Sequence, residues 1–252
     1  MSALNGKTST YDLMQGWNAL DRMDGTSAVA HFRRAVDLEE TSPASRAEAL
    51  YGLGLSYGYA NPPQVAEAVA AFAQITKDYP SADCAGWAAL ESVLLRGRAG
   101  DIDSVAEAEA LLEVAGRYRD HAVIHEATLR AAMSLLEAGQ GERSVMLLND
   151  HLRQYPDNEE APLMRFLVAY WKMEIDEDYE GALPILLELA NHNLAEPRRR
   201  AMVMWSIAQI YRLHHDDPQT ALVWYRRIVA EFPNEITTGD AQRMISQLEK
   251  TP

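Results

Sequence analysis

Two stretches of this chain share one pattern: Ala68-Val-Ala-Ala-Phe72-Ala-Gln-Ile75-Thr-Lys-Asp-Tyr79-Pro80 and Ala221-Leu-Val-Trp-Tyr225-Arg-Arg-Ile228-Val-Ala-Glu-Phe232-Pro233. Alanine, an aromatic residue and isoleucine recur at i, i+4 and i+7 in both stretches, which is the spacing of one apolar helix face. The proline that closes each stretch marks the end of that helix, because proline lacks a backbone N–H. The pattern therefore predicts a helical unit that occurs more than once.

Related segments recur along the chain at a nearly constant interval. The expected unit ends are separated by 37, 40, 36, 38 and 39 residues and fall at Pro43, Pro80, Asp120, Pro156, Leu194 and Pro233. This period indicates stacked helix pairs, each of which buries its apolar face on the next. The expected pairs are 11–24 with 27–40, 44–59 with a helix opened by Pro62, 82–97 with 103–118, a pair divided at Gly139-Gln-Gly141, 159–175 with 179–192, and 197–213 with 218–231, before a terminal helix over 238–249.

The expected fold is an all-α, right-handed superhelix of about six helix pairs plus a C-terminal capping helix. We expect a single repeat domain over residues 11–249 and a flexible N-terminus over residues 1–10. Ser42 before Pro43 and Asp217 before Pro218 read as helix caps followed by a proline in the first turn. Gly54 would let a neighbouring helix approach closely, because it has no Cβ.

The composition of the chain limits the kinds of partner that it can bind. The chain is 48% apolar and 24% charged, which is typical of a soluble helical protein. Its net charge of −14 disfavours nucleic acid and anionic lipid, which require clustered cations. One cysteine excludes an internal disulfide, and neither a signal peptide nor a membrane span is recognisable. We expect a cytoplasmic location, or a periplasmic one if an export signal has been removed.

The helix pairs resemble the tetratricopeptide repeat family. Its unit has Leu, Gly or Ala, and Tyr on the first helix, then Ala, an aromatic residue and a final Pro on the second. The resemblance covers nearly the whole chain and is weak in the third and fifth pairs. The matching residues of the second, fourth and sixth pairs are Leu53, Gly54, Tyr57, Ala68, Phe72 and Pro80; Ala132, Ser144, Leu148 and Pro156; and Ile207, Ala208, Tyr211, Ala221, Tyr225 and Pro233. The junctions at residues 79–85 and 155–161 are loosely similar to those of bacterial envelope members of the family.

The resemblance implies that a peptide or helix binds along the concave side, which the first helices line. One variety of the family grips a C-terminal carboxylate with Lys and Asn, but the corresponding positions here hold Tyr51 and Leu55, Leu129 and Met133, and Trp205 and Gln209. The implied groove is therefore aromatic and aliphatic. The candidate partner-binding residues are Tyr51, Leu55, Met133, Trp205, Gln209 and Arg212. The alternative is that these aromatic residues only pack between neighbouring helices.

Other polar clusters have simpler explanations. His121 and His125 stand at i and i+4 next to Glu126, yet a zinc site needs a third ligand that the sequence does not place. The acidic turn at residues 176–180 reads as a solvated surface, with a basic partner as the alternative. The run Arg198-Arg-Arg200 is too small for a nucleic-acid surface, and Cys84 reads as a small core residue.

The chain contains no glycine-rich phosphate loop, G-x-S-x-G elbow, H-E-x-x-H motif or paired cysteines. We therefore expect a non-enzymatic scaffold that binds another protein or peptide, with no cofactor or metal. One alternative is a self-associating structural protein, either a homo-oligomer or a subunit of a larger assembly. A second is an α-helical enzyme with His121, His125 and a glutamate in one closed pocket.

Overall fold

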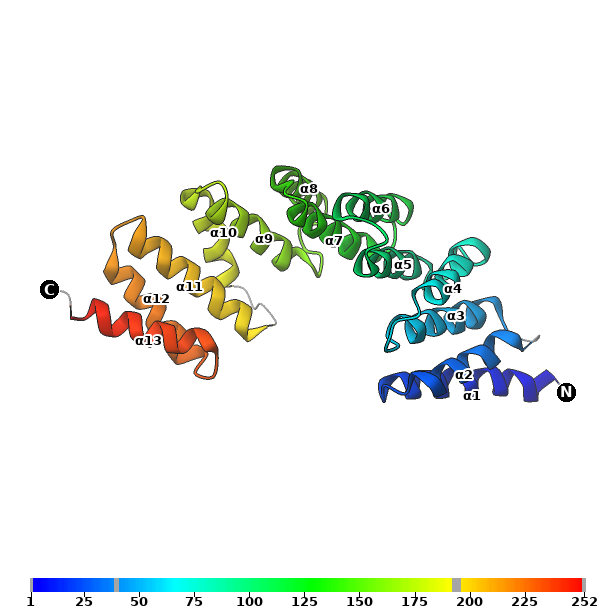
Figure 1. The fold of residues 1–252 in the computed structure, drawn as a ribbon. Coiled ribbons are helices and arrows are strands. Elements are labelled where there is room, and N and C mark those ends of the chain that lie inside the picture. Colours follow the sequence, from blue (N-terminus) through cyan, green and yellow to red (C-terminus); the bar gives the residue numbers. More distant parts are fainter. Residues whose placement is uncertain (1, 39–40, 192–195, 251–252) are drawn as a thin grey trace. The chain divides into compact units, whose positions relative to one another are not determined.

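The computed structural model describes residues 2–38, 41–191 and 196–250. These residues form thirteen helices and no strand (Figure 1). The helices are α1 (Ser2–Asp21), α2 (Gly25–Asp37), α3 (Pro43–Gly58), α4 (Val65–Asp78), α5 (Ala85–Ala99), α6 (Ser104–Arg117), α7 (Val123–Glu137), α8 (Gly141–Gln154), α9 (Ala161–Glu174), α10 (Tyr179–Asn191), α11 (Pro197–Leu213), α12 (Pro218–Glu231) and α13 (Ile236–Leu248). The all-α class and the expected six pairs with a terminal helix are confirmed. The expected unit end at Leu194 lies outside the described residues.

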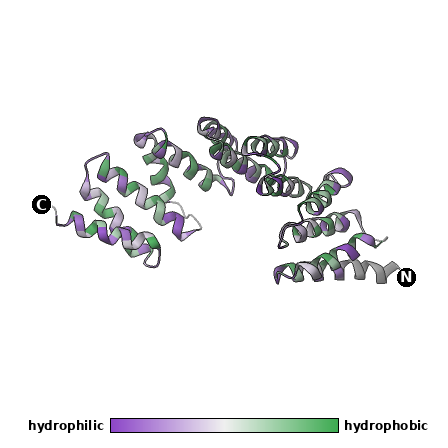
Figure 2. Cartoon of the chain, in the orientation of Figure 1, coloured by the Kyte–Doolittle hydropathy of each residue, from purple (hydrophilic) through white to green (hydrophobic). Residues whose placement is uncertain are grey.

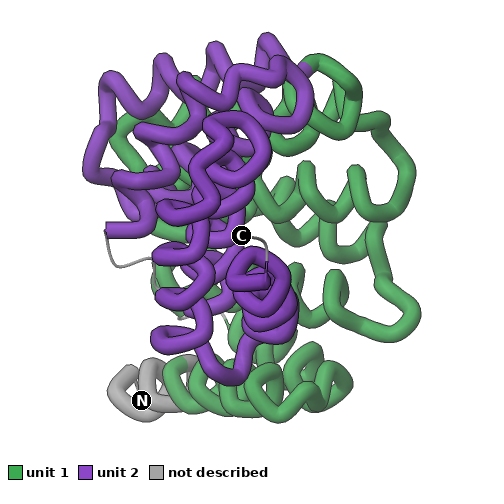
Figure 3. Tube along the Cα trace, turned by 90° about the vertical axis from the view of Figure 1, so that its left-hand side faces the viewer, with its two compact units in different colours: residues 1–140 green, residues 141–252 purple. Residues whose placement is uncertain are grey.

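The chain forms two compact units, residues 1–140 and residues 141–252 (Figure 3). The first contains α1 to α7 and the second α8 to α13, and within each unit helices that follow one another along the chain are in contact. In the first unit α1, α3, α5 and α7 also contact one another in succession, as expected for stacked pairs. Each unit is a run of such helices, so the single repeat domain over residues 11–249 stays a prediction.

Side-chain caps mark the starts of several helices, including α3, α6 and α12. The side chains of Ser42, Asp103 and Asp217 accept the backbone N–H groups of Ser45, Ala106 and Thr220, which satisfies donors that would otherwise lack a partner at the starts of α3, α6 and α12. The expected caps before Pro43 and Pro218 are confirmed. Helix α10 also runs through Pro184 without a break.

The starts of α4 and α1 differ from the expectation. Helix α4 begins at Val65 rather than at Pro62, because Pro62 is followed by a second proline and a residue in that position is driven out of the helical conformation. Helix α1 begins at Ser2 rather than near residue 11, and no proline interrupts residues 2–10. The flexibility expected for residues 1–10 stays a prediction.

In the core of the first unit, phenylalanine rings pack directly against glycines of neighbouring helices. Phe32 is completely buried, and a Cβ added at Gly16 or Gly52 would collide with its ring. Phe72 of α4 lies in the same way against Gly54 of α3. The close approach expected at Gly54 is therefore confirmed, and the contact with Phe72 explains why this repeat carries a glycine here.

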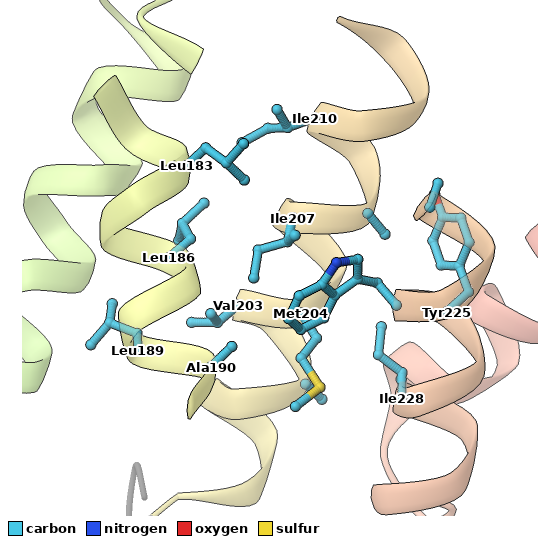
Figure 4. Packing of buried hydrophobic residues seen from close by; sticks show 14 of the residues in the cluster. Leu183, Leu186, Leu189, Ala190, Val203, Met204, Ile207, Ile210, Tyr225 and Ile228 are labelled. Carbon is cyan, nitrogen blue, oxygen red and sulfur yellow. The ribbon is translucent and has the colours of Figure 1, made fainter. Parts of the chain in front are cut away.

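The core of the second unit lies between α10, α11 and α12 (Figure 4). Figure 4 shows Leu183, Leu186 and Leu189 of α10 facing the side of α11 that carries Val203 and Ile207, with Tyr225 and Ile228 of α12 beyond α11. Figure 2 shows hydrophobic and hydrophilic residues alternating along the helices, as expected of amphipathic helices.

The last helix, α13, packs on α11 and α12 mainly through Ala241, Thr238 and the partly buried Met244. Its other side is polar and exposed, which fits the expected capping role. None of the helices in residues 2–38, 41–191 and 196–250 has the length and apolar character needed to cross a membrane.

Candidate functional site

In the first unit, one side of α3 carries Tyr51, Leu55 and, at its C-terminal end, Tyr59. Tyr51 and Leu55 are half-buried, and the Tyr51 ring lies 5.9 Å from the ring of Phe72. Tyr59 is 61% exposed. Burial, together with the negative charge of Glu91, raises the pKa of Tyr51, so its phenol stays protonated and can act as a hydrogen-bond donor. Tyr51 therefore serves partly in packing and partly at the surface.

Next to this face lies a hollow of about 270 Å³ between α5, α6, α7 and the end of α3. Its apolar lining consists of Tyr59, Leu94 and Met133. Its polar lining consists of Glu91, Glu107, Glu137, Arg98, Arg130 and Ser134. Met133, the candidate residue on α7, thus lies in a surface that combines apolar and charged groups.

The charged groups of this hollow differ in how tightly they are held. Arg130 donates from Nε to Glu126 Oε1 over 2.7 Å, one turn back on the same helix. Arg98 Nη2 is 3.8 Å from Glu91 Oε2, a separation too long for a hydrogen bond. Burial raises the pKa of Glu91, although the nearby Arg98 and Arg130 lower it. Burial also raises the pKa of Glu107, and a hydrogen bond from Ser134 opposes this shift.

In the second unit, one side of α11 carries Met202, Trp205, Gln209 and the adjacent pair Arg212 and Leu213. Met202 is 44% exposed and Leu213 57% exposed. Trp205 is half-buried, with its ring 5.3 Å from that of Tyr225. Arg212 donates from Nε and Nη2 to Gln209 Oε1, at 3.1 and 2.8 Å, which holds both polar side chains on this side of the helix. We call these five residues the α11 strip.

The candidate residues thus lie on two surfaces, one in each unit. Tyr51, Leu55 and Met133 belong to the first unit, whereas Trp205, Gln209 and Arg212 belong to the α11 strip. The aromatic members are half-buried, so packing accounts for part of each side chain and leaves the rest available. Their role in binding stays a prediction.

Sequence reasoning missed the charged residues of the hollow. Glu91, Leu94 and Arg98 recur at i, i+3 and i+7 along α5, which is a helix-face spacing visible in the sequence. The third pair matches the repeat pattern weakly, so no register was available to place this face. The resemblance implied an aromatic and aliphatic groove, and in the first unit the hollow beside Tyr51 and Leu55 adds charged groups to that surface.

The i, i+4 spacing of His121 and His125 predicts that both imidazoles lie on one helix face, and this prediction is wrong. His121 precedes α7, which begins at Val123, so the two imidazoles do not stand on one helix. His121 Nδ1 accepts the Val123 N–H over 3.0 Å, and Nε2 lies 2.9 Å from the Asp83 carbonyl, so Nε2 carries the proton. His121 therefore ties the start of α7 to the loop before α5.

Neither the metal hypothesis nor the enzyme hypothesis gains support from this region. No group of three or more His, Cys, Asp or Glu side chains within residues 2–38, 41–191 and 196–250 is placed to hold a metal ion. The hollow that includes His121 is lined by Asp83 and Asp120 and, among the described residues, by no glutamate. The closed pocket that the enzyme hypothesis requires is therefore not formed around His121.

The remaining sequence candidates have partners within their own unit. In the acidic turn, Asp178 forms an ion pair with Lys172 and accepts the Gly181 N–H. In the arginine run, Arg200 pairs with Glu231 at 3.4 Å. Burial raises the pKa of the half-buried Cys84 thiol, which disfavours the reactive thiolate. These groups are explained by local structure.

Comparisons with known proteins agree with this architecture. Residues 48–82, which contain most of α3 and all of α4, match the family model described as tetratricopeptide repeat. The structure is similar to that of PilF from Pseudomonas aeruginosa, with a TM-score of 0.59, 12% sequence identity, and coverage of 95% of this chain and 98% of that one. It is also similar to a tetratricopeptide repeat protein from Parabacteroides merdae ATCC 43184, with a TM-score of 0.58, 13% identity, and coverage of 96% and 90%. No curated protein matches the sequence.

Proposed function

We propose that this chain, a tetratricopeptide repeat protein by its fold and by the repeat at residues 48–82, is a non-enzymatic scaffold that binds an apolar peptide or helix of another protein. The observation that carries the proposal is the α11 strip. Large apolar side chains that are exposed at helical spacing are the usual content of a recognition surface. Here Met202 and Leu213 flank the half-buried Trp205 on one side of a rigid helix.

The α11 strip has the composition of a binding centre. A tryptophan held against Tyr225 offers a large apolar surface whose orientation is already fixed, so little conformational freedom is lost when a partner covers it. Gln209 and Arg212 lie beside it and supply hydrogen-bond donors for the edge of the contact. An amphipathic helix whose apolar residues recur at i, i+3, i+4 and i+7 would match this spacing.

The first unit supplies a second surface of the same kind. Tyr51, Leu55 and Tyr59 present aromatic and aliphatic surface along α3, and the phenol of Tyr51 remains protonated. Each unit thus carries its own apolar strip. Peptide binding at each strip is therefore tested with a variant of its own.

Selection from a library of random peptides displayed on phage, with the purified chain as bait, tests the proposal. Selected peptides are synthesised, and their Kd values are measured by fluorescence anisotropy on the wild type, Trp205→Ala and Tyr51→Ala. We expect amphipathic peptides whose affinity falls about tenfold or more in one of the two variants. Val223→Ala on α12 is the control, because Val223 is also exposed but lies outside both strips.

Far-UV circular dichroism first establishes that every variant is folded. The proposal fails if no peptide is selected. It also fails if the selected peptides bind Trp205→Ala and Tyr51→Ala as tightly as they bind the wild type.

Self-association is the second candidate function, because α1 leaves Tyr11 54% exposed and Met14 52% exposed, three residues apart on one side of the helix. Light scattering at two protein concentrations measures it. We expect a concentration-dependent mass for the wild type and a monomer for the double variant Tyr11→Ser/Met14→Ser, if this face joins two copies. A wild-type mass equal to that of the monomer at both concentrations rules it out.

A further inference from the structure

We propose that the hollow between α5, α6 and α7 receives one cationic side chain, a lysine or an arginine, from the partner segment. This rests on the proposed function, because the cation belongs to a peptide bound along the first unit. It requires a positive charge in the partner, whereas the apolar strips require only apolar side chains. Three features of the hollow support it: the charges that line it, the position of the Glu107 side chain, and the apolar residues of its lining.

The charges lining the hollow do not balance. Among the described residues, the lining contains the carboxylates of Glu91, Glu107 and Glu137 but the guanidinium groups of only Arg98 and Arg130. Arg130 is engaged with a further carboxylate, that of Glu126, over 2.7 Å. Arg98 is 58% exposed and stays 3.8 Å from Glu91, where water screens the attraction. The hollow therefore has an excess of negative charge that a partner's cation would compensate.

The carboxylate of Glu107 lies where its ionised form is destabilised unless a cation is nearby. A Cβ at position 97 would overlap its carboxylate, so the glycine of α5 is what lets the Glu107 side chain lie flat against that helix. The carboxylates of Glu107 and Glu91 are both partly withdrawn from water, and burial raises the pKa of each. A carboxylate with a raised pKa is one whose negative charge lacks full stabilisation, and a nearby cation would supply it.

The rest of the lining suits the stem of a long basic side chain. Tyr59, Leu94 and Met133 provide apolar surface beside the carboxylates. The aliphatic part of lysine or arginine packs on such surface while the charged end reaches the acids. Because Tyr59 is 61% exposed, the face of its ring is also available to a cation.

An anionic ligand fits less well. It would meet Glu91, Glu107 and Glu137 on entering, and it would have to draw Arg130 away from Glu126. The whole chain also carries a net charge of −14, which attracts basic partners and repels acidic ones. Charge complementarity therefore selects a cation.

The test is an NMR titration of the full chain with four small probes. Two are cationic, N-acetyl-arginine methylamide and N-acetyl-lysine methylamide. Two are neutral analogues of matching shape, the citrulline and norleucine derivatives. We expect saturable shifts of the amide signals of residues 91, 97 and 107 with a cationic probe, at a Kd below about 50 mM, and none with the neutral probes. The stronger of the two cationic probes identifies the preferred side chain.

Variants separate this site from general attraction to an acidic protein. Glu91→Gln and Glu107→Gln should each weaken the cationic probe about fivefold, whereas Glu113→Gln should leave its affinity unchanged. Glu113 lies on α6, as Glu107 does, but it is exposed and lines a different hollow, between α4, α5 and α6. The amide spectrum of each variant shows whether it is folded.

The proposal is overturned if the citrulline derivative causes the same shifts as the arginine derivative. It is also overturned if no probe saturates, or if Glu113→Gln weakens binding as much as Glu107→Gln does. These results are independent of the phage selection: selected peptides that still depend on Trp205 would leave the scaffold function standing. Conversely, a cationic probe that binds while no peptide is selected would leave this site standing and remove the proposed function.

Discussion

Replacing Gly54 by alanine tests whether close helix packing defines the repeat. The new Cβ would lie 2.5 Å from Phe72 Cε1 and 2.8 Å from two more ring carbons. Phe72 is only 2% exposed, so a shift of its ring would disturb its packing against the neighbouring buried residues. Overpacking of this kind costs about 1–3 kcal/mol, and three short contacts place Gly54→Ala in the upper part of that range.

The same substitution also favours the helix itself. Alanine is better than glycine inside a helix by about 1 kcal/mol, so the expected net loss for Gly54→Ala is about 1–2 kcal/mol. Gly116→Ala is the matched control, because a Cβ there meets no atom of the described residues within 4 Å and Gly116 also lies within a helix, α6. It should be neutral or gain up to about 1 kcal/mol. The two identical replacements should therefore differ by about 2 kcal/mol.

Urea unfolding, followed by far-UV circular dichroism, measures both effects, provided that the slopes of wild type and variants agree. Phe72→Leu supplies a further check, because the smaller side chain leaves room for the Cβ. In a double-mutant cycle, Gly54→Ala should then cost less in the Phe72→Leu background than in the wild type. The reasoning is refuted if Gly54→Ala unfolds at the same urea concentration as the wild type or a higher one, or if Gly116→Ala loses as much stability.

Three further outcomes follow from the structure. The folded-state pKa of Glu91 lies above its ordinary value of 4.5, so the ionised carboxyl destabilises the fold. Glu91→Gln should therefore raise the thermal midpoint at pH 7, and this gain should disappear near pH 4, where the carboxyl is protonated. An equal gain at both pH values would contradict this. Asp103→Ala removes the cap of α6 and should lower the free energy of unfolding by about 1 kcal/mol in urea titrations, whereas an unchanged midpoint would show that the cap contributes nothing. Cys84 should react with iodoacetamide more slowly in the native protein than in urea, because burial keeps the thiol protonated, and equal rates would disprove its protection.

The helix pairs could be predicted from the sequence because their signals are local. The apolar spacing around Phe72 and the caps at Ser42 and Asp217 each depend on residues within a few positions of one another. The start of α4 differs from the expected one for an equally local reason, since Pro63 drives Pro62 out of the helical conformation. The helix face expected to be shared by His121 and His125 was wrong for a different reason: the His121 imidazole bonds to the backbone of Asp83, 38 residues away.

The all-α class, the repeat period, the close helix approach at Gly54 and the face of α11 that carries Trp205 could all be predicted from the sequence, because helical periodicity turns a spacing into a direction. Only the tertiary structure decided the chemistry of the first unit. Glu91, Glu107 and Arg130 stand on three helices, and each looks like an ordinary surface charge in the sequence. Packing of α5, α6 and α7 brings the three side chains to one hollow and partly removes the two carboxylates from water, which is a property that no single segment contains.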